Sequence, residues 1–119
     1  MKSILIIGLG RFGRHLCRKF MSLNNEVMIV DRDEAAVTAL ADEVTSAQIA
    51  DCTDENALRA LGVKNFDLCF VCIGSDFASS LLITSMLKDM GAARVVAKAS
   101  RDIPRQAAAA QRRGRGGLP

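Results

Sequence analysis

The 119-residue sequence has no tryptophan or tyrosine, a single histidine and only two prolines. It also has no long hydrophobic run, since no stretch approaches the roughly 18 unbroken apolar residues that a membrane-spanning helix requires. The apolar run near the N-terminus is short and meets glycines and Arg11 instead of a cleavage site, which argues against a signal peptide. These absences predict a cytoplasmic chain without direct membrane insertion.

Side chains that perform catalysis are equally scarce. His15 is the only histidine, it falls one turn into a predicted helix, and no Cys/His or Ser/His arrangement accompanies it. A chain of this length has room for one domain and one core, so a separate substrate domain does not fit. The sequence therefore predicts no catalytic residues and no enzyme. Two other functions stay open for the chain, an NAD-dependent oxidoreductase fragment and a free-standing nucleotide-binding module with unrelated partners.

Four cysteines are present, and Cys69 and Cys72 have C-x-x-C spacing within an apolar run. In a strand, residues three apart point to opposite faces, so these two sulfurs cannot share a metal ion or a disulfide. We predict that the cysteines are small buried core residues and that the chain has no metal site. A redox or zinc role is the alternative.

The formal net charge of +3 is unevenly distributed along the chain. Residues 1–104 carry 12 Lys and Arg against 13 Asp and Glu, whereas residues 105–119 add four arginines and no acid. The basic surplus therefore belongs to the tail. Its R-G-R-G-G segment resembles a fragment of an RNA-binding sequence, but without interleaved aromatic residues it gives little support for that function, and no nucleic-acid partner is expected.

Apolar strands alternate with helical patterns along the chain. The predicted strands cover residues 3–8, 26–31, 46–51, 66–74 and 93–99. This alternation is typical of an α/β protein with a Rossmann-like, doubly wound parallel sheet, here of about five strands with helices on both faces and right-handed crossovers.

The helices between these strands have recognisable inner faces and ends. The first is expected to present Phe12, Leu16, Phe20 and Leu23, and the last Leu82, Ile83, Met86, Leu87 and Met90. A second helix should start near Asp33, with Val37 and Leu40 inward, and a third should be capped by Thr53 or Asp54 and end at Gly62.

A G-x-G-x-x-G motif, Gly8, Gly10 and Gly13, lies where the first strand meets the first helix. In this context Gly8 allows the tight turn, Gly10 lets the backbone approach a phosphate, and Gly13 permits close packing of helix on strand. Backbone N–H groups and the positive end of the helix dipole then face the anion. The alternative is that the glycines serve only a tight turn.

Asp31 ends the second strand, 18 residues beyond Gly13. At this position the dinucleotide-binding fold presents a carboxylate that accepts hydrogen bonds from both ribose hydroxyls. The same charge would repel the 2′-phosphate of NADP, and Arg32 offers only partial relief, so a ligand with free ribose hydroxyls is favoured. The alternative is a helix-capping or solvated acid.

Two further strand ends point at the same crevice, because ligands of open α/β sheets bind beyond the carboxyl ends of the strands. Asp51, Cys52 and Thr53 could border an adenine, and Ile73 with Gly74 could line the path of the ribose and phosphates. For these residues simple turn chemistry is the alternative.

Arg11 lies inside the glycine turn, where a dehydrogenase usually has a small or apolar residue. Its guanidinium could hold a pyrophosphate or a terminal γ-phosphate with paired donors, so its engagement would depend on the number of phosphates. The alternative is an ordinary surface charge.

Several segments together resemble the N-terminal lobe of an RCK domain, also called KTN or TrkA-N. They are GLGRFGRHL, VDRDE, IADCTDENALRALGV, FDLCFVCIGSDFASSLLITSMLKDMG and VVAKASRDI, and the resemblance covers residues 2 to about 103. It implies a cytosolic regulatory subunit of a bacterial potassium transporter, peripheral to the inner face of the membrane through its partner. Such a subunit senses ATP against ADP, or NADH against NAD, and its homo-oligomer, a dimer or a ring in the full-length form, gates a membrane-embedded transporter.

The resemblance also assigns roles to individual positions. It implies that Gly8, Gly10, Arg11, Phe12 and Gly13 lie at the phosphates, Asp31 and Arg32 at the ribose and adenine, Asp51 and Cys52 at the base, and Ile73, Gly74 and Lys98 at the far wall. For Lys98, a solvated lysine is the alternative.

The family pattern and this chain part after residue 103. The resemblance implies a helix and a sixth strand with a pattern like RKxLLRNGADEVVYP, whereas residues 104–119 are PRQAAAAQRRGRGGLP. Codons for Q-R-R-G-R-G-G-L-P exist that read N-G-A-D-E-V-V-Y one base later. We therefore expect a nucleotide-binding domain over residues 1–103, followed by a non-native basic tail that arose by a frame shift near residues 104–106. The sixth strand is then missing and the fifth strand is an exposed edge.

Overall fold

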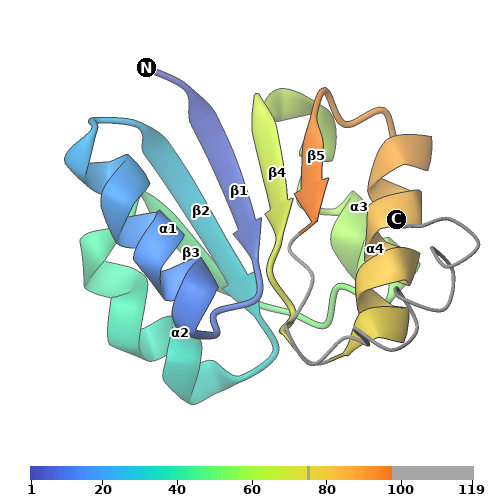
Figure 1. Ribbon diagram of the computed structural model, residues 1–119, viewed down its shortest axis with the longest axis horizontal. Helices are drawn as coiled ribbons and strands as arrows, with labels where there is room; N and C mark the ends of the chain where they lie inside the picture. The colour runs from blue at the N-terminus through green and yellow to red at the C-terminus, as the bar shows by residue number, and fades with distance from the viewer. Residues whose placement is uncertain (75, 98–119) are drawn as a thin grey trace, which may run out of the picture.

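A five-stranded parallel sheet forms the centre of the computed structural model, which describes residues 1–74 and 76–97 (Figure 1). Its strands are β1 (Ser3–Ile7), β2 (Glu26–Asp31), β3 (Ser46–Ile49), β4 (Leu68–Val71) and β5 (Val95–Ala97). All neighbouring strands pair in parallel, in the order β3-β2-β1-β4-β5. The strand order reverses at β1, so the predicted Rossmann-like, doubly wound sheet is confirmed.

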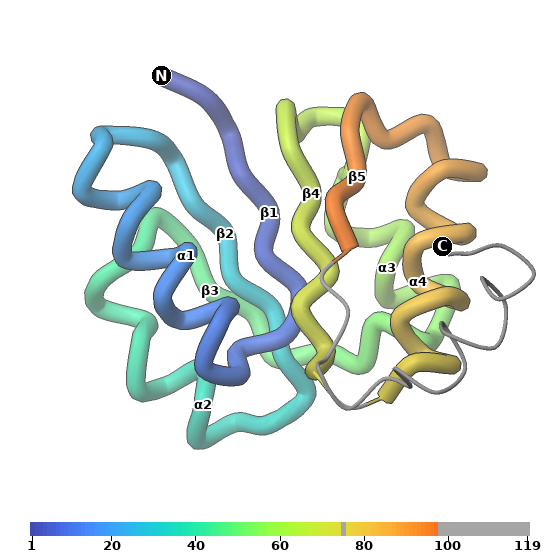
Figure 2. The backbone as a smooth tube through the Cα atoms, viewed as in Figure 1, coloured from blue at the N-terminus to red at the C-terminus, as the bar shows by residue number. Residues whose placement is uncertain are grey.

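Four α-helices connect the strands: α1 (Arg11–Ser22), α2 (Glu34–Leu40), α3 (Glu55–Arg59) and α4 (Phe77–Asp89). Two short 3₁₀ turns, η1 (Ala41–Glu43) and η2 (Val63–Asn65), follow α2 and α3. Figure 2 shows α1 and α2 together on one side of the molecule and α3 and α4 on the other. Each crossover therefore adds a helix to one of the two faces, as a parallel sheet requires.

Alternate side chains of β1 belong to two separate hydrophobic cores, one on each face of the sheet. Ile4 and Ile6 pack with Cys17 of α1 and with α2, whereas Leu5 and Ile7 pack with Leu58 of α3 and with α4. All four of these β1 side chains are almost fully buried. Because both faces of the strand are covered, β1 reads as a continuous apolar run in the sequence.

The prediction for the C-x-x-C pair is confirmed. Cys69 belongs to the core under α3 and α4, and Cys72 belongs to the core under α1 and α2, so the two sulfurs lie on opposite faces of the sheet. All four cysteines are buried. Burial raises the pKa of Cys69 to about 11, so it carries no thiolate at neutral pH.

Short acidic side chains start three of the helices. Asp33 accepts a hydrogen bond from the amide of Ala35, Asp54 from that of Asn56, and Asp76 from that of Ser79. The predicted start of the second helix is therefore right, and Asp54 rather than Thr53 caps the third. Gly62 lies two residues after Ala60, the C-cap of α3, and has a φ of +70° in the left-handed region.

The inner faces of two helices differ from the prediction. Phe12 is 38% exposed and Leu23 is 57% exposed, because Gly13 and Cys17 occupy the buried face of α1. In α4, Ile83 and Leu87 are buried as expected, whereas Leu82 is 47% exposed. In α1 the close approach of Gly13 to the strand decides which side of the helix faces inward.

Several predicted strands end early. The fourth covers Leu68–Val71 instead of residues 66–74, and the third ends at Ile49 instead of residue 51. β4 ends early because β1 leaves the sheet at the Gly8 turn. Among the described residues, the last backbone hydrogen bond between the two segments runs from the Cys72 amide to the Ile7 carbonyl oxygen at 2.7 Å, and beyond it β4 has no strand partner on this side. Residues beyond Val71 are thereby released to form a loop at the carboxyl edge of the sheet.

The end of the predicted fifth strand, Lys98, the predicted loss of a sixth strand and the whole tail lie outside the described residues. Within residues 1–97 other than position 75, β5 is an edge of the sheet. In that same part of the chain, no helix combines the length and apolar character needed to cross a bilayer.

Candidate nucleotide site

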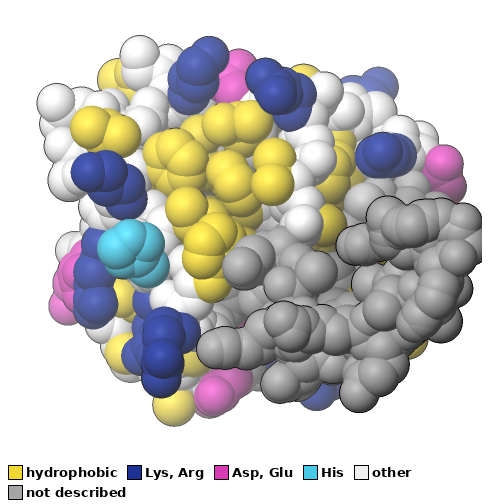
Figure 3. Space-filling model, in the orientation of Figure 1, with side chains coloured by type: hydrophobic (Ala, Val, Ile, Leu, Met, Phe, Trp, Pro, Cys, Tyr) yellow, Lys and Arg dark blue, Asp and Glu magenta, His cyan; other side chains and the backbone are white. Residues whose placement is uncertain are grey.

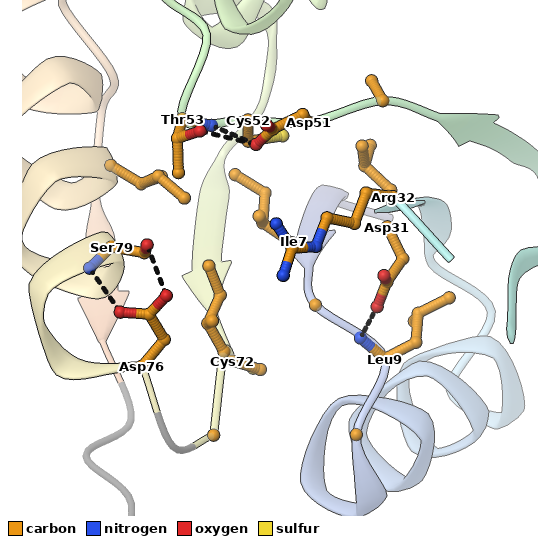
Figure 4. Close-up of a pocket in the computed structure, with 17 residues that line it drawn as sticks. Ile7, Leu9, Asp31, Arg32, Asp51, Cys52, Thr53, Cys72, Asp76 and Ser79 are labelled. Carbon is orange, nitrogen blue, oxygen red and sulfur yellow. Dashed lines mark hydrogen bonds between the residues drawn. The ribbon is translucent and has the colours of Figure 1, made fainter. Parts of the chain in front are cut away.

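A pocket of about 310 Å³ opens at the carboxyl ends of the strands, where the strand order reverses (Figure 4). This is the position at which open α/β sheets bind their ligands. Residues from the ends of β1, β2 and β4, from the loop after β3 and from the start of α4 line it: Ile7, Gly8, Leu9, Gly10, Val30, Asp31, Arg32, Ala50, Asp51, Cys52, Thr53, Cys72, Ile73, Gly74, Asp76, Ser79 and Ile83.

The three glycines of the turn face different surroundings. At Gly8 φ is +100° and an added Cβ would lie 2.5 Å from the Cys72 carbonyl oxygen, so only glycine fits. At Gly13 an added Cβ would lie 2.1 Å from the Gly8 carbonyl oxygen, which is the close packing of helix on strand that the motif predicts. Around Gly10 an added Cβ would meet nothing within 4 Å. Gly8 and Gly13 therefore build the turn, and Gly10 leaves open space above it.

The start of α1 differs from the other α-helix starts. Its N-cap residue is Gly10, which supplies no side-chain acceptor, and its first turn contains no acidic residue. The first N–H groups of a helix have no partner within the helix, and the helix dipole makes this end positive. In α2, α3 and α4 an aspartate caps this end. The start of α1 is thus the helix end at the pocket that suits an external anion.

Asp31 ties the end of β2 to the glycine turn. Its Oδ2 accepts a hydrogen bond of 2.7 Å from the Leu9 amide, and its Oδ1 accepts one of 2.9 Å from the Asp33 amide. Figure 4 shows the carboxylate beside the turn at the pocket wall. A carboxylate has about four acceptor positions, so both oxygens retain capacity for a ligand's hydroxyl groups.

The loop after β3 holds a second carboxylate at the pocket. The Thr53 hydroxyl donates to Oδ1 of Asp51 at 2.6 Å, and the Thr53 amide donates to the same oxygen at 3.0 Å. These hydrogen bonds, the side-chain one first, lower the pKa of Asp51, and the charge of Arg32 lowers it a little further against the opposing effect of burial. Asp51 is therefore a fixed anion at neutral pH.

Asp76 and Ser79 at the start of α4 are pocket residues that the sequence prediction missed. The Ser79 hydroxyl donates to Oδ2 of Asp76 at 2.6 Å and the Ser79 amide to Oδ1 at 2.9 Å, and these bonds lower the pKa of Asp76. The charge of Arg32 again contributes a smaller lowering. The available signal was the D-x-x-S cap that follows the fourth strand, because a cap at that place sits at the carboxyl edge of the sheet.

Arg32 extends over the pocket from the end of β2 in Figure 4. It lies near enough to both Asp51 and Asp76 to stabilise their charged forms. With Asp31, the charged residues that line the described pocket comprise three carboxylates and one guanidinium. An anionic part of a ligand is therefore expected at the start of α1 rather than among these carboxylates.

Cys52 closes the inner end of the pocket and is 5% exposed. Burial, followed by the charges of Asp51 and Asp31, raises the pKa of its thiol to about 12. Since the thiolate is the nucleophile, Cys52 serves as a wall and not as a reactive group at neutral pH. In the described ranges no three His, Cys, Asp or Glu side chains are grouped so that they could hold a metal ion.

The structure brings nine of the predicted site residues to the pocket: Gly8, Gly10, Asp31, Arg32, Asp51, Cys52, Thr53, Ile73 and Gly74. Arg11, Phe12 and Gly13 do not line it. Gly13 is buried against Gly8, whereas Arg11 and Phe12 point outward from the first turn of α1. The predicted place of these three residues at the phosphates of a ligand stays a prediction. Lys98 lies outside the described residues.

The parallel sheet, the glycine turn at the start of α1 and the acid at the end of β2 together define a domain of the Rossmann-like class. A solved structure of this class is the NAD(P)-binding domain of an exopolyphosphatase-related protein from Archaeoglobus fulgidus. It superposes with a TM-score of 0.71 at 27% identity, over 86% of this chain and 77% of that one. The TrkA-N domain model matches residues 4–111, and the chain belongs to the TrkA-N domain family.

Three curated relatives of the chain are named as potassium uptake proteins. The Ktr system potassium uptake protein C of Bacillus subtilis is 41% identical over 101 residues, which cover 85% of this chain and 46% of the relative. The Ktr system potassium uptake protein A of Vibrio alginolyticus is 34% identical over 99 residues, 83% of this chain and 45% of the relative. The chain thus spans about half the length of these relatives.

Proposed function

We propose that this chain is the nucleotide-binding lobe of a potassium-transport regulatory protein and that it binds an adenine nucleotide, NAD(H) or ATP/ADP, without turning it over. The observation that carries the proposal is the combination of an uncapped α1 start at Gly10 with the Asp31 carboxylate 2.7 Å from the Leu9 amide. These two features offer a donor site for phosphate and an acceptor site for ribose at opposite sides of one turn.

A bound adenosine compound would use the pocket from one end to the other. Its phosphates would lie above Gly10, where no side chain intervenes, and receive N–H groups from the first turn of α1. Its ribose hydroxyls would donate to Asp31. Its base would lie toward the loop of Asp51, Cys52 and Thr53, with apolar contact from Ile73. The residues that meet the ligand are therefore those that the strand ends bring together.

The same charges favour ligands without a 2′-phosphate. Within residues 1–74 and 76–97, no basic side chain is hydrogen-bonded to Asp31, and both of its oxygens already accept from backbone amides. A 2′-phosphate would be placed against this carboxylate, with only Arg32 nearby to compensate. NAD(H) or ATP/ADP is thus the better fit than NADP(H).

The partner proposed for the domain is a membrane-embedded potassium transporter subunit. This part of the proposal draws on the names of the relatives, which are potassium uptake proteins, and on the family to which the chain belongs. In the full-length protein the domain would act as part of a cytoplasmic homo-oligomer, a dimer or a ring, at the inner face of the membrane. Ligand-dependent changes in the pocket would then alter how the oligomer holds the transporter.

A regulatory role fits the chemistry of the pocket better than hydride transfer does. His15 projects from α1 as an exposed residue and does not line the pocket, and Cys52 is held as a thiol. The carboxylates of Asp51 and Asp76 are engaged by Thr53 and Ser79. An oxidoreductase fragment is the second candidate from the sequence, and the described pocket offers no general acid or base in its support.

Thermal unfolding with and without nucleotides tests the proposal. A ligand present at about 100 times its Kd adds about 2.7 kcal/mol to the free energy of unfolding. For a domain of this size that raises Tm by roughly 10 °C. We expect ATP, ADP or NAD(H) to raise Tm and NADPH to raise it less.

The matched control is Asp31→Asn, which keeps an acceptor oxygen for the turn and removes the charge. It should reduce the ligand-induced shift while allowing the chain to fold. If no adenine nucleotide raises Tm of the wild-type chain, the proposal is wrong, and steady consumption of a nucleotide with a small substrate would favour the oxidoreductase.

A further inference from the structure

The outer face of α1 is a continuous row of basic side chains. Arg11, Arg14, His15, Arg18 and Lys19 follow one another at spacings of three and four residues, so they share one side of the helix. All five are exposed, and α1 contains no acidic residue. We call these five residues the basic stripe. It contrasts with residues 1–104 as a whole, in which acids outnumber Lys and Arg by one.

The arginines in the N-terminal part of the basic stripe oppose the stability of the helix, whereas Lys19 lies in the last turn, where a base is favourable. Arg14 and Arg18 are four residues apart and Arg11 and Arg14 three apart, spacings at which like charges repel. Arg11 and Arg14 also lie at the positive end of the helix dipole, where acids rather than bases are favourable. Among the described residues one acid compensates the stripe, since Glu43 forms an ion pair with Arg18 at 2.9 Å. Arg11 and Arg14 are therefore unfavourable for the isolated helix and suited to contact with an anionic partner.

Packing fixes the direction in which the stripe points. Gly13 and Cys17 on the opposite face of α1 are fully enclosed by the core, so the helix cannot rotate. Figure 3 shows dark-blue Lys and Arg side chains gathered around the cyan side chain of His15, the only histidine of the chain, with an apolar surface beside them. Two large apolar side chains near the ends of α1 are also exposed, Phe12 at 38% and Leu23 at 57%.

We propose that the basic stripe docks on the anionic phospholipid headgroups of the membrane surface. A surface of many phosphates matches a row of cations with no pocket, and exposed apolar side chains at both ends of the row suit the boundary between headgroups and acyl chains. A short acidic peptide would leave the exposed Leu23 side chain in contact with water. The contact is independent of the pocket, although Arg11 lies at the junction of the two sites, and it would orient the domain on the membrane beside its transporter.

Co-sedimentation of the full chain with vesicles tests this inference. We expect binding to vesicles that contain phosphatidylglycerol, no binding to pure phosphatidylcholine vesicles, and release at high ionic strength because salt screens the attraction. The double variant Arg14→Glu/Lys19→Glu reverses two charges of the stripe without touching the pocket. It should lower the partition coefficient at least about tenfold. Each Lys or Arg near an anionic leaflet contributes about 1 kcal/mol to binding, and the variant removes two of them.

The matched control is Lys64→Glu/Lys88→Glu, which makes the same change of net charge at two exposed lysines away from α1. It should bind phosphatidylglycerol vesicles within about threefold of the wild type, which the general attraction of net charge alone allows. The inference is overturned if both double variants lose vesicle binding equally. It is also overturned if the wild type does not bind these vesicles, and an acidic protein surface then becomes the candidate partner of the stripe.

Two further readouts separate this inference from loss of folding and from the proposed function. The stripe variant should unfold within a few degrees of the wild type, because the gain from an acid near the start of the helix is offset by the loss of Lys19 from its last turn, where a base is favourable. Its nucleotide-induced shift in Tm should be unchanged. If the stripe variant binds vesicles as well as the wild type does, the proposed lipid contact is wrong. An unchanged nucleotide-induced shift in Tm would show in that case that the nucleotide site is unaffected.

Discussion

The amide of Leu9 donates a hydrogen bond of 2.7 Å to Oδ2 of Asp31, which joins the glycine turn to the end of β2. Leu9 is 5% exposed, so its amide has little access to water as an alternative partner. The carboxylate proposed to meet the ribose therefore also holds the loop proposed to meet the phosphates. Changes at Asp31 should affect stability and affinity together.

Asp31→Ala is expected to lower both quantities. Loss of the acceptor leaves the Leu9 amide unpaired in a buried position, which costs about 1–3 kcal/mol of the free energy of unfolding. Affinity for all adenosine ligands should fall by similar factors, because the ribose is common to them. Chemical denaturation and calorimetric titration measure the two effects. A loss confined to one nucleotide would contradict the assignment of Asp31 to the ribose.

Gly10→Ala and Gly13→Ala form a matched pair in which one methyl group is added at two places in one turn. At Gly13 the new Cβ would lie 2.1 Å from the Gly8 carbonyl oxygen, and we expect a loss of about 1–3 kcal/mol or more in stability from overpacking. At Gly10 it meets no neighbour within 4 Å, so Tm should change little while the nucleotide-induced shift falls. Equal nucleotide shifts for Gly10→Ala and the wild type would place the phosphates elsewhere.

Arg11→Ala is predicted to reduce discrimination between ATP and ADP more than it reduces their common affinity. Arg11 is the first residue of α1 and is exposed, so its guanidinium can reach a terminal phosphate only from the edge of the pocket. Titration of both nucleotides against the variant measures the ratio of affinities. Equal proportional losses for ATP and ADP would count against a sensing role for this residue.

Thr53→Val should raise the pKa of Asp51 toward its ordinary value. The variant removes the hydroxyl donor at 2.6 Å and keeps the backbone donor at 3.0 Å. A lowered carboxyl pKa stabilises the fold above the pKa of the unfolded chain, near 4, and this contribution is lost as pH falls through the folded pKa. The variant should therefore begin to lose it at a higher pH. NMR titration of Asp51 and Tm measured between about pH 3 and 7 follow the change, and an unmoved Asp51 titration would show that the hydroxyl bond is not what lowers the pKa.

The proposed frame shift makes a prediction about the encoding DNA. Codons for residues 111–119 should read N-G-A-D-E-V-V-Y when taken one base later, and restoring that frame near residues 104–106 should restore the strand-forming pattern that follows the fifth strand in the family. DNA sequencing decides this directly. Codons that encode some other peptide in the neighbouring frame would end the hypothesis.

The sheet, its two helical layers and the glycine turn could be predicted because their causes are local. Continuous apolar runs indicate strands covered on both faces, Gly13 is required by its contact with the Gly8 carbonyl five residues away, and Gly8 has a φ of +100° that favours glycine. The opposite placement of Cys69 and Cys72 likewise follows from the geometry of one strand. The strand lengths were less predictable, since each strand ends where its neighbour leaves the sheet.

The sequence by itself determined the order of strands and helices along the chain, the glycine turn between β1 and α1, and the acid at the end of β2. Only the tertiary structure decided which side chains share the pocket. The crossover to α4 carries Asp76 and Ser79 to the carboxyl edge beside Arg32, whereas the exposed Arg11 and Phe12 at the start of α1 are not among the residues that line the pocket. The reason is physical: a chain's periodicity fixes which face of an element is buried, but neighbours in a cavity are set by how separate elements pack across the sheet.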